Sequence, residues 1–486
     1  MGAKAPFFSS RHAIPMPFCC IKPFVTQLIF LVACLLTAGS ALAQLPPPIN
    51  QALKTAQIPA ANLGLIVQAV DAPHALLSHN ANQAMNPASV MKLVTTYAAL
   101  ELLGPAHTWQ TTLLSENVAV DGQIRGNLYL QGSGDPRLTR EHLWLLLRQL
   151  RVRGIEQILG DIVVDRSIFA AEAFNPAAFD NKPLRAYNVG PNGLLIDFQA
   201  LRFTLQPGME DVNLWLETPI AGLSLNNRLR LQQGACPADW RDRINMSHQP
   251  ETGQLLVTGS YAQECGERSL NLAPLSADQH ADGLLRHLWQ EMGGQLSGKV
   301  RHGSTPATSV PLARHESAPL TEIIRDINKL SNNVMARQVF LSLDEGQPAS
   351  SQGAGERIQH WLKTRKLDFP ELVVDNGSGL SRQERISAGN MNRLLIDAWR
   401  NPLMPEFIAS LPLSGIDGTM KKRLNGSPAT GRAHIKTGTL NGVRTAAGYL
   451  IDQQGQRYAL TIFINDPRAA EAAPVIDALL NWLAAR

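Results

Sequence analysis

The sequence has few of the features that would place it in a specialised class of protein. Only five of its 486 residues are cysteine, 6% are aromatic, and 44 basic residues nearly balance 40 acidic ones. This balance gives no indication of a nucleic-acid partner. Glycine (37) and proline (31) occur in ordinary numbers, and 44% of the residues are hydrophobic, which argues against a collagen or a disordered chain. The composition is that of a globular protein.

Several kinds of site are also missing. The 12 histidines form no H-E-x-x-H motif and no close ligand pair with cysteine, so we expect no metal and no other cofactor. No G-x-S-x-G motif is present, which argues against the nucleophile elbow of α/β-hydrolases. Gly293, Gly298 and Lys299 have the spacing of a phosphate-binding loop, but Val300 stands where a hydroxyl would bind magnesium. We interpret that stretch as a turn into a strand.

Long apolar stretches are confined to the amino terminus. Residues 1–22 hold three basic and no acidic residues, Phe24–Leu36 is apolar, and Ala41-Leu42-Ala43 has the small residues of a cleavage site. This order predicts a secretory signal peptide over 1–43, and hence an exported protein with no stable membrane anchor. Two alternatives stay open. The segment could be a retained anchor, although it is shorter than the ~20 residues needed to span a membrane, or Cys34 could be lipidated.

Removal of the signal peptide would leave Cys236 and Cys265 as the remaining cysteines. In an oxidising compartment, such a pair predicts a structural disulfide. Closing a loop of about 30 residues would stabilise the fold by roughly 3–4 kcal/mol. Two unpaired buried thiols are the alternative.

The order of expected elements predicts a domain interrupted by an insertion. Residues 63–70 have the β-branched and apolar character of a strand, and Asn86-Pro87 should begin a helix that ends near Gly104. Many short strands are expected over 106–304, for example 127–131, 158–164, 213–216 and 254–258. Later we expect helices over 320–330, 333–343 and 472–485, and antiparallel strands over 434–439, 445–452 and 457–465.

These elements divide the mature chain into three segments. Strands at both ends with helices between them predict one α/β (α+β) domain, formed by residues 44–105 and 305–486. Residues 106–304 would be a large β-rich insertion, and the number of its strands favours two nested domains. The apolar face of the last expected helix should pack on the sheet rather than on a membrane, because this helix carries little positive charge.

Ser89-Val90-Met91-Lys92 is the sharpest chemical feature of the sequence. Residues i and i+3 share one face of a helix, so the Lys92 amine can approach the Ser89 hydroxyl. A neutral Lys92 could remove the serine proton, and burial or a second cation nearby would lower its pKa toward that role. On its own, however, S-x-x-K occurs by chance about once or twice in a chain of this length.

Two further motifs give the first one its meaning. Ser331-Asn332-Asn333 should begin a helical segment, and Lys436-Thr437-Gly438 lies on an expected strand. The order S-x-x-K, S-x-N, K-T-G resembles the motif set of the penicillin-recognising serine enzymes. The long gap between the first two motifs is similar to that of the class C low-molecular-mass penicillin-binding proteins, the D-alanyl-D-alanine carboxypeptidase/endopeptidases of the penicillin-binding protein 4 type. Residues 132–136, 375–381 and 415–419 also look like that family.

The resemblance implies a fold and a location. The expected fold is a penicillin-recognising serine transpeptidase/β-lactamase-like domain, an antiparallel sheet flanked by helices and interrupted by the β-rich insertion. The partners implied are peptidoglycan stem peptides, with β-lactam antibiotics as inhibitors, and the implied location is the periplasm. Asp135, Asp375 and Asp417 lie in the family-like loops, where we expect them to shape turns rather than to act chemically.

The resemblance also implies roles for the catalytic residues. Ser89 would attack the terminal D-alanyl-D-alanine bond and, as a second activity, D,D-cross-links. In both cases it would form an acyl-enzyme that water hydrolyses, with Lys92 as the general base. Ser331 would pass a proton to the leaving amine, and Asn333 would orient Lys92 and the substrate amide. Lys436 would keep Lys92 neutral through its positive charge.

Three residues around the third motif are implied in substrate binding. Thr437 would bind the terminal carboxylate, to which Lys436 is also attracted, and Gly438 would let the substrate backbone lie along the strand edge. The backbone N–H groups of Ser89 and Thr439 would form the oxyanion hole. Two other functions remain open at this point, a serine β-lactamase of the same fold and a non-catalytic protein that binds the cell wall.

Overall fold

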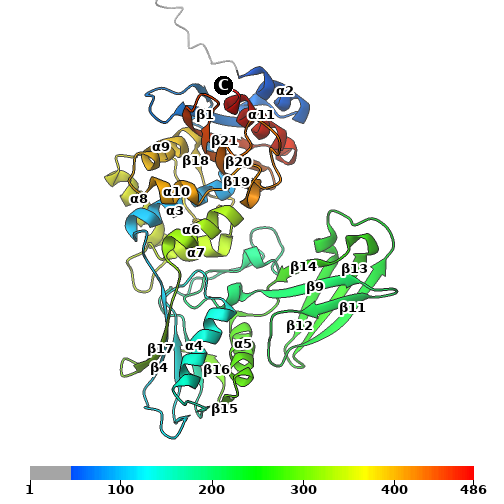
Figure 1. Cartoon of the computed structure of the whole chain (residues 1–486), viewed down its shortest axis with the longest axis vertical. Helices are drawn as coiled ribbons and strands as arrows, with labels where there is room; N and C mark the ends of the chain where they lie inside the picture. The colour runs from blue at the N-terminus through cyan, green and yellow to red at the C-terminus, as the bar shows by residue number, and fades with distance from the viewer. Residues whose placement is uncertain (1–44) are drawn as a thin grey trace, which may run out of the picture. The chain divides into compact units, whose positions relative to one another are not determined.

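A five-stranded antiparallel sheet forms the centre of the part of the chain that carries the three motifs (Figure 1). The computed structural model describes residues 45–486, so the signal peptide expected over 1–43 and the alternative of a lipidated Cys34 lie outside the described residues. The strand order is β19-β20-β21-β1-β2. The strands are β19 (Ala433–Leu440), β20 (Val443–Ile451), β21 (Arg457–Asn465), β1 (Leu63–Ala69) and β2 (Leu77–His79).

The first strand of the sheet pairs with the last one. β1 lies antiparallel to β21, with Leu65 opposite Ile462 and Val67 opposite Leu460. Alternate residues point to opposite faces of a strand, and in β21 the side chains of Leu460 and Ile462 enter one apolar core whereas that of Phe463 enters another. The sheet is therefore covered on both faces, as expected for a sheet that is flanked by helices.

Helices form the two outer layers. One face of the sheet is covered by the two terminal helices, α2 (Pro47–Ala56) and α11 (Ala473–Ala484). The apolar face of α11 is buried against the sheet, which confirms the expected packing. The other face packs on α9 (Ala388–Trp399). Beyond it, five further helices share the same apolar core: α3 (Lys92–Leu102), α6 (Leu320–Leu330), α7 (Asn333–Leu341), α8 (Ser351–Thr364) and α10 (Met404–Ala409). Within residues 45–486, no helix has the length and apolar character needed to cross a membrane.

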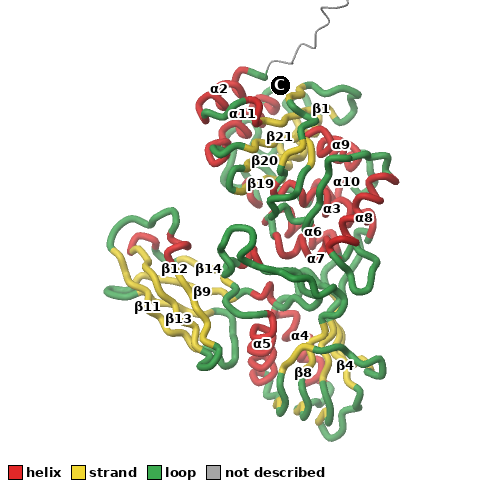
Figure 2. Tube along the Cα trace, turned by 180° about the vertical axis from the view of Figure 1, so that it is seen from behind, coloured by secondary structure: helices red, strands yellow, loops and turns green. Residues whose placement is uncertain are grey.

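The insertion contains two β-rich parts, seen from behind in Figure 2. The first has a five-stranded sheet in the order β16-β8-β6-β4-β17 and a small parallel sheet in the order β15-β7-β5. Their strands are β4 (Gln110–Ser115), β5 (Gln123–Ile124), β6 (Leu128–Gln131), β7 (Gln157–Ile158), β8 (Ile162–Asp165), β15 (Gln295–Leu296), β16 (Val300–His302) and β17 (Val310–Glu316).

The second part has two three-stranded sheets, in the orders β10-β9-β14 and β11-β13-β12. Their strands are β9 (Leu201–Pro207), β10 (Val212–Leu216), β11 (Ser224–Gln232), β12 (Ile244–Gln249), β13 (Gln254–Ala262) and β14 (Arg268–Leu272). The β-rich character expected of the insertion is confirmed.

Two details of the insertion differ from the sequence prediction. Two amphipathic helices, α4 (Arg140–Val152) and α5 (Ala277–Glu291), share the apolar core of its five-stranded sheet, whereas the sequence pattern predicts only strands there. The single strand expected over 158–164 is divided between β7 and β8, which belong to different sheets. The division occurs at Gly160, where the chain passes so close to the Gly126 carbonyl group that a Cβ atom would collide with it.

The end of the insertion lies later in the chain than the boundary at residue 304. β17 pairs with β4 in the five-stranded sheet of the insertion. We therefore propose that the inserted region ends near Glu316, and that the second catalytic segment begins just before α6. On the catalytic side of this junction, Asp326 of α6 accepts a hydrogen bond of 2.7 Å from Arg137 of the insertion.

The insertion also contacts α7, the helix that begins at the second motif. The Gln338 side chain exchanges hydrogen bonds of 2.8 Å with the backbone N–H and carbonyl groups of Asn192. The buried Arg337 guanidinium donates to the carbonyl oxygen of Val189 at 2.8 Å. These contacts fix α7, and with it the start of the second motif, against the inserted region.

Cys236 and Cys265 form a disulfide, as predicted. The bridge joins the loop after β11 to the segment before β14, 29 residues apart.

Replacing both cysteines by alanine should lower the free energy of unfolding of the insertion by roughly 3–4 kcal/mol, because the unfolded chain regains the freedom of the closed loop. Urea unfolding followed in the oxidised protein measures this effect. A reducing agent should destabilise the wild-type protein and leave the double variant unchanged; equal sensitivity of both proteins would contradict the prediction.

Candidate active site

Ser89 lies on a tight turn between the sheet and helix α3. The turn is a 3₁₀ helix, η2 (Ala88–Met91), and α3 follows it directly. The sequence predicts an α-helix that begins at Asn86-Pro87 with Asn86 as its cap. The Asn86 side chain does accept a hydrogen bond of 2.9 Å from the Ala88 backbone N–H, but regular α-helix begins only at Lys92. The nucleophile therefore lies before the helix rather than within its first turn.

The backbone just before Ser89 has an unusual conformation. Ala88 has a φ of 46°, in the left-handed region that residues with side chains rarely adopt. Gly438 packs against Thr445 of β20 and against this turn: a Cβ atom there would collide with the Thr445 hydroxyl and lie 2.9 Å from both the Ala88 Cβ and the Pro87 carbonyl oxygen. Glycine in the K-T-G motif is thus required by the packing of the nucleophile's own turn, a reason that the sequence did not reveal.

The Lys92 amine lies at the centre of the site and is fully buried. Its Nζ atom is 3.1 Å from the Ser89 Oγ and 2.6 Å from the Asn333 Oδ1. It also donates a hydrogen bond to the Ser378 carbonyl oxygen. The fold thus brings Ser89 and Asn333, which belong to two motifs far apart in the chain, within hydrogen-bond distance of the Lys92 amine.

The surroundings of Lys92 favour its neutral form. Burial lowers the pKa of Lys92 well below its usual value, and the charges of Lys436 and Arg337 lower it further. The Glu384 carboxylate acts in the opposite direction and raises it. Burial is the largest of these effects, so the neutral amine, the form that can accept a proton, is favoured more than in an exposed lysine.

Ser331 and Lys436 form the second polar pair of the site. Lys436 is fully buried on β19, and its Nζ atom donates to the Ser331 Oγ at 2.9 Å and to the Thr437 carbonyl oxygen at 2.7 Å. Burial lowers the pKa of Lys436 to about 7. Ser331 itself precedes the helix that the S-x-N motif begins. It ends α6 in the left-handed conformation, with a φ of 57°, and Asn332 caps α7 by accepting a hydrogen bond from the Met335 backbone N–H.

The third motif lies on the outer strand of the five-stranded sheet. β19 pairs with β20 on one side, and on its other edge His434 bridges to Leu413. The part of that edge from Thr437 onward is left for an extended peptide. The Thr437 hydroxyl lies 3.0 Å from that of Thr419, in the 415–419 loop. The Thr439 hydroxyl is more exposed and accepts a hydrogen bond of 2.8 Å from Arg444.

The motifs line one open cavity of about 590 Å³, a size that suits a short peptide. Ser89, Ser331, Asn333, Thr437 and Thr439 all face it. Other walls are contributed by the insertion, including Phe179, Asp180 and Tyr187. Within residues 45–486, no group of three or more His, Cys, Asp or Glu side chains could hold a metal ion.

Two parts of the site were missed in the sequence. Lys92 is held partly by a backbone carbonyl, that of Ser378, which no side-chain motif can reveal. Glu384 is fully buried behind the loop that contains Ser378. Its carboxylate accepts hydrogen bonds of 3.2 and 3.1 Å from the backbone N–H groups of Asn376 and Gly377. Burial raises the pKa of Glu384 to about 7. No pattern around this acidic residue in the sequence pointed to Lys92.

Two of the three aspartates of the family-like loops make contacts of the kind expected in turns. Asp135 accepts a hydrogen bond of 2.8 Å from the backbone N–H two residues later, at Arg137. Asp417 accepts the Leu413 backbone N–H at 2.8 Å and pairs with Lys329 at 2.6 Å. Asp375 is exposed. The contacts of Asp135 and Asp417 shape the loops around the cavity.

Comparisons with known proteins identify relatives over most of the chain. D-alanyl-D-alanine carboxypeptidase DacB of Haemophilus influenzae is 27% identical over 429 residues, covering 86% of this chain and 88% of the relative. A D-alanyl-D-alanine carboxypeptidase of an Actinomadura species is 29% identical over 477 residues, covering 92% and 86%. The crystal structure of penicillin binding protein 4 from H. influenzae, complexed with a β-lactam, shares the fold, with a TM-score of 0.73 and 24% identity over 91% of this chain and 100% of that one.

A family model covers almost the whole of the described chain. It matches residues 47–486, a range that includes all three motifs and the insertion between them. The chain therefore belongs to the D-Ala-D-Ala carboxypeptidase 3 (S13) family.

Proposed function

We propose that the chain acts in the periplasm as a serine D-alanyl-D-alanine carboxypeptidase on peptidoglycan stem peptides, through an acyl-enzyme on Ser89. The observation that carries this proposal is the position of Lys92, fully buried, 3.1 Å from the Ser89 hydroxyl and with its pKa well below the usual value. A lysine in this state accepts a proton from a serine that attacks a carbonyl carbon. The location in the periplasm rests on the predicted signal peptide.

The acylation step follows from these contacts. The Ser89 Oγ forms a bond to the carbonyl carbon of the penultimate D-alanine as its proton passes to Lys92. The bond from that carbon to the nitrogen of the terminal D-alanine then breaks, and the nitrogen receives, by way of the Ser331 hydroxyl, the proton that Lys92 took from Ser89, so Lys92 is neutral again. Lys436 lies 2.9 Å from Ser331 and holds its hydroxyl in place. Water later attacks the ester and releases the shortened peptide, so that Ser89 and its proton are restored.

Lys436 and Thr437 suit the terminal carboxylate of the substrate. Lys436, a buried residue of β19, supplies positive charge. The Thr437 hydroxyl lies at the surface of the cavity beside Thr419. The backbone N–H groups of Ser89 and Thr439 would bind the oxyanion of the tetrahedral intermediate. A β-lactam resembles the D-alanyl-D-alanine end and would acylate the same serine. A D,D-cross-link, which has the same D-alanyl carbonyl, would be a second substrate of this site.

A fluorescent penicillin tests the proposal. The purified protein should form a lasting covalent adduct, because hydrolysis of the acyl-enzyme is slow, and Ser89→Ala should abolish the label. Ser224→Ala, which removes an exposed hydroxyl on β11 outside the catalytic cavity, is the matched control and should keep full labelling. Rapid release of hydrolysed penicillin would indicate a β-lactamase, and no labelling at all would contradict catalysis at Ser89.

The pKa values of the two lysines predict the pH dependence of the carboxypeptidase reaction. The neutral form of Lys92 increases with pH, which raises kcat/KM. The charged form of Lys436 decreases as the pH passes about 7, which lowers attraction of the substrate carboxylate and hence kcat/KM. We therefore expect a bell-shaped profile of kcat/KM whose alkaline limb lies near pH 7.

The profile of kcat should differ from that of kcat/KM. A bound carboxylate beside Lys436 favours its charged form and raises its pKa, so the alkaline limb of kcat should move to higher pH. Steady-state rates with a D-alanyl-D-alanine peptide between about pH 5 and pH 10 measure both limbs. The same alkaline limb in both profiles would contradict a role for the Lys436 charge in binding.

A further inference from the structure

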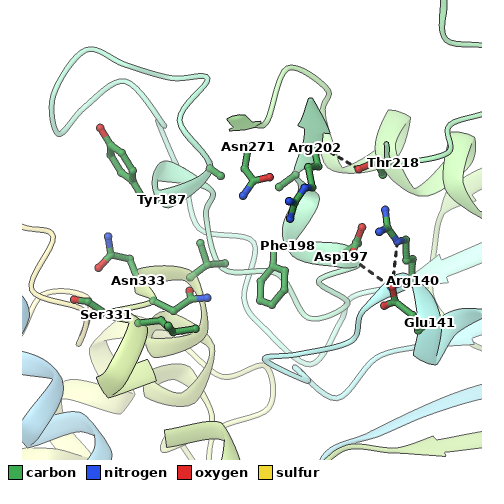
Figure 3. Close-up of a pocket in the computed structure, with 15 residues that line it drawn as sticks. Arg140, Glu141, Tyr187, Asp197, Phe198, Arg202, Thr218, Asn271, Ser331 and Asn333 are labelled. Atoms are coloured by element: carbon green, nitrogen blue, oxygen red, sulfur yellow. Dashed lines mark hydrogen bonds and ion pairs between the residues drawn. The ribbon is translucent and has the colours of Figure 1, made fainter. Parts of the chain in front are cut away.

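A second cavity adjoins the catalytic cavity on the side of the inserted region (Figure 3). Its volume is about 440 Å³. The two cavities share part of their walls, since Tyr187, Leu330, Ser331 and Asn333 line both. The second motif, S-x-N, therefore forms the boundary between them. A molecule bound at Ser89 can extend past this boundary into the second cavity without leaving the protein surface.

The far wall of the second cavity is polar and comes entirely from the insertion. Figure 3 shows Arg140, Asp197, Arg202 and Asn271 around it, opposite Ser331 and Asn333. Arg140 pairs with Glu141 at 3.2 Å, and Arg202 pairs with Glu217 at 2.9 Å. Each guanidinium has five N–H donors, so these pairs leave donors free for a ligand. The wall thus presents arginine donors for carboxylates and an aspartate for an amine.

A strained turn of the backbone positions the centre of this cavity. Asp197, Phe198 and Gln199 have φ values of 47°, 55° and 50°, so three successive residues with side chains are left-handed. Such conformations are unfavourable, and they concentrate at binding sites. The turn is held by hydrogen bonds of 2.8 Å from the Asp197 backbone N–H to the Leu138 carbonyl and from the Gln199 side chain to the Leu275 carbonyl.

The result of this turn is the placement of Phe198. In the view of Figure 3 its ring lies between the Ser331–Asn333 edge and the Arg140–Asp197 side of the cavity. The ring gives the cavity a flat aromatic surface beside the apolar side chains of Leu330 and Val334. A cavity with one aromatic surface and surrounding charged groups of both signs matches a peptide that carries carboxylates and an amine.

We propose that the second cavity binds the leaving peptide when the substrate is a D,D-cross-link. This inference rests on the proposed function. With a simple stem peptide, the leaving group is one D-alanine, which the catalytic cavity can hold. With a cross-link, the bond from the D-alanyl carbonyl carbon to the side-chain nitrogen of a second stem breaks, and that nitrogen receives the proton. The leaving group is then an entire peptide, which requires room beyond Ser331.

The position of Ser331 connects the two cavities to the chemistry. Ser331 lines both cavities, and it would pass the proton to the leaving nitrogen. The leaving nitrogen of a cross-link is therefore at the boundary, and the peptide attached to it enters the second cavity. The catalytic cavity keeps the acyl half of the substrate on Ser89.

Arg202→Ala and Asn271→Ala test this assignment. For each variant, kcat/KM is measured with a cross-linked dimer of two stem peptides and with a single stem that ends in D-alanyl-D-alanine. We expect roughly a tenfold loss with the dimer for Arg202→Ala, as for a lost charged hydrogen bond, and a smaller loss for Asn271→Ala. The single stem should be cleaved at the wild-type rate. Arg230→Ala, on exposed β11 outside both cavities, is the matched control and should change neither.

Acylation by fluorescent penicillin separates the possible failures. It reports an intact catalytic site without using the second cavity, so wild-type labelling of a variant shows that it is folded. Equal losses with both substrates, or no loss with the dimer, would overturn the second-cavity proposal alone. Cleavage of the single stem but not of the dimer by the wild-type protein would overturn it as well. Absence of Ser89-dependent labelling in the wild-type protein would instead overturn the proposed function.

Discussion

Replacing Lys92 by methionine should slow acylation of Ser89 by a factor on the order of 10³, the usual contribution of a general base. Methionine keeps most of the length of the buried side chain but has no nitrogen to accept the serine proton. The Asn333 amide oxygen and the Ser378 carbonyl oxygen would both lose their shared donor. The second-order rate constant for acylation by a fluorescent penicillin measures the loss.

The control for Lys92→Met must separate catalysis from folding. Lys422→Met removes an exposed lysine by the same substitution and should leave the acylation rate unchanged. Thermal unfolding of both variants shows whether the loss at Lys92 arises from an unfolded protein. A folded Lys92→Met variant that is acylated within about tenfold of the wild-type rate would exclude Lys92 as the base.

Gly379→Ala should have the second largest effect, although Gly379 has no chemical role. It has a φ of 79°, and a Cβ atom there would collide with the Ala88 carbonyl oxygen and lie 2.7 Å from the Ser89 Cα. The added methyl group must displace the turn that carries the nucleophile. Since a displacement of about 1 Å can cost 10²-fold in rate, we expect acylation to fall by about that factor.

Gly104→Ala provides a matched control for Gly379→Ala. Gly104 has a φ of 88°, but a Cβ atom there would meet nothing within 4 Å. Both variants therefore impose the cost of a left-handed alanine, about 1–2 kcal/mol of stability, and only Gly379→Ala also pushes on Ser89. Thermal destabilisation of both proteins, with normal acylation of Gly104→Ala, is the expected result. Normal acylation of Gly379→Ala would show that the turn tolerates the methyl group.

The sequence predicted those parts of the protein that depend on side chains in short patterns. The strands near the carboxyl terminus follow from runs of apolar residues, and Ser89, Lys92, Ser331 and Lys436 follow from three motifs. These four side chains do meet in one site, through hydrogen bonds within the pairs Ser89–Lys92 and Ser331–Lys436. Their order along the chain was sufficient because it resembles the motif set of a known family.

Other parts of the site depend on the backbone and on contacts between distant segments. The Ser378 carbonyl holds Lys92, yet any residue at that position has a carbonyl group. The buried Glu384 and the clash that requires Gly379 become visible only when the 375–384 loop is placed against Ser89.

Helix α4 was missed for a different reason. Its residues Leu143, Leu146, Leu147 and Leu150 have helical spacing and are all buried. The pattern was therefore readable in the sequence, but the many turn residues on either side of it favoured short strands. Segments rich in turn residues lie on both sides of the helix. Their indication of a β-rich region outweighed the helical spacing of the four leucines.

The pairing of β1 with β21 has a consequence for how the chain matures. Leu65 lies opposite Ile462, which follows it by 397 residues, so the catalytic sheet cannot be completed until both segments are available. The sheets of the insertion are formed by residues 110–316 alone and can be completed earlier. Contacts between segments so distant in sequence form slowly and leave apolar strands exposed in the meantime. The central sheet is therefore completed only by contacts between distant segments, whereas the sheets of the insertion need a single continuous stretch of the chain.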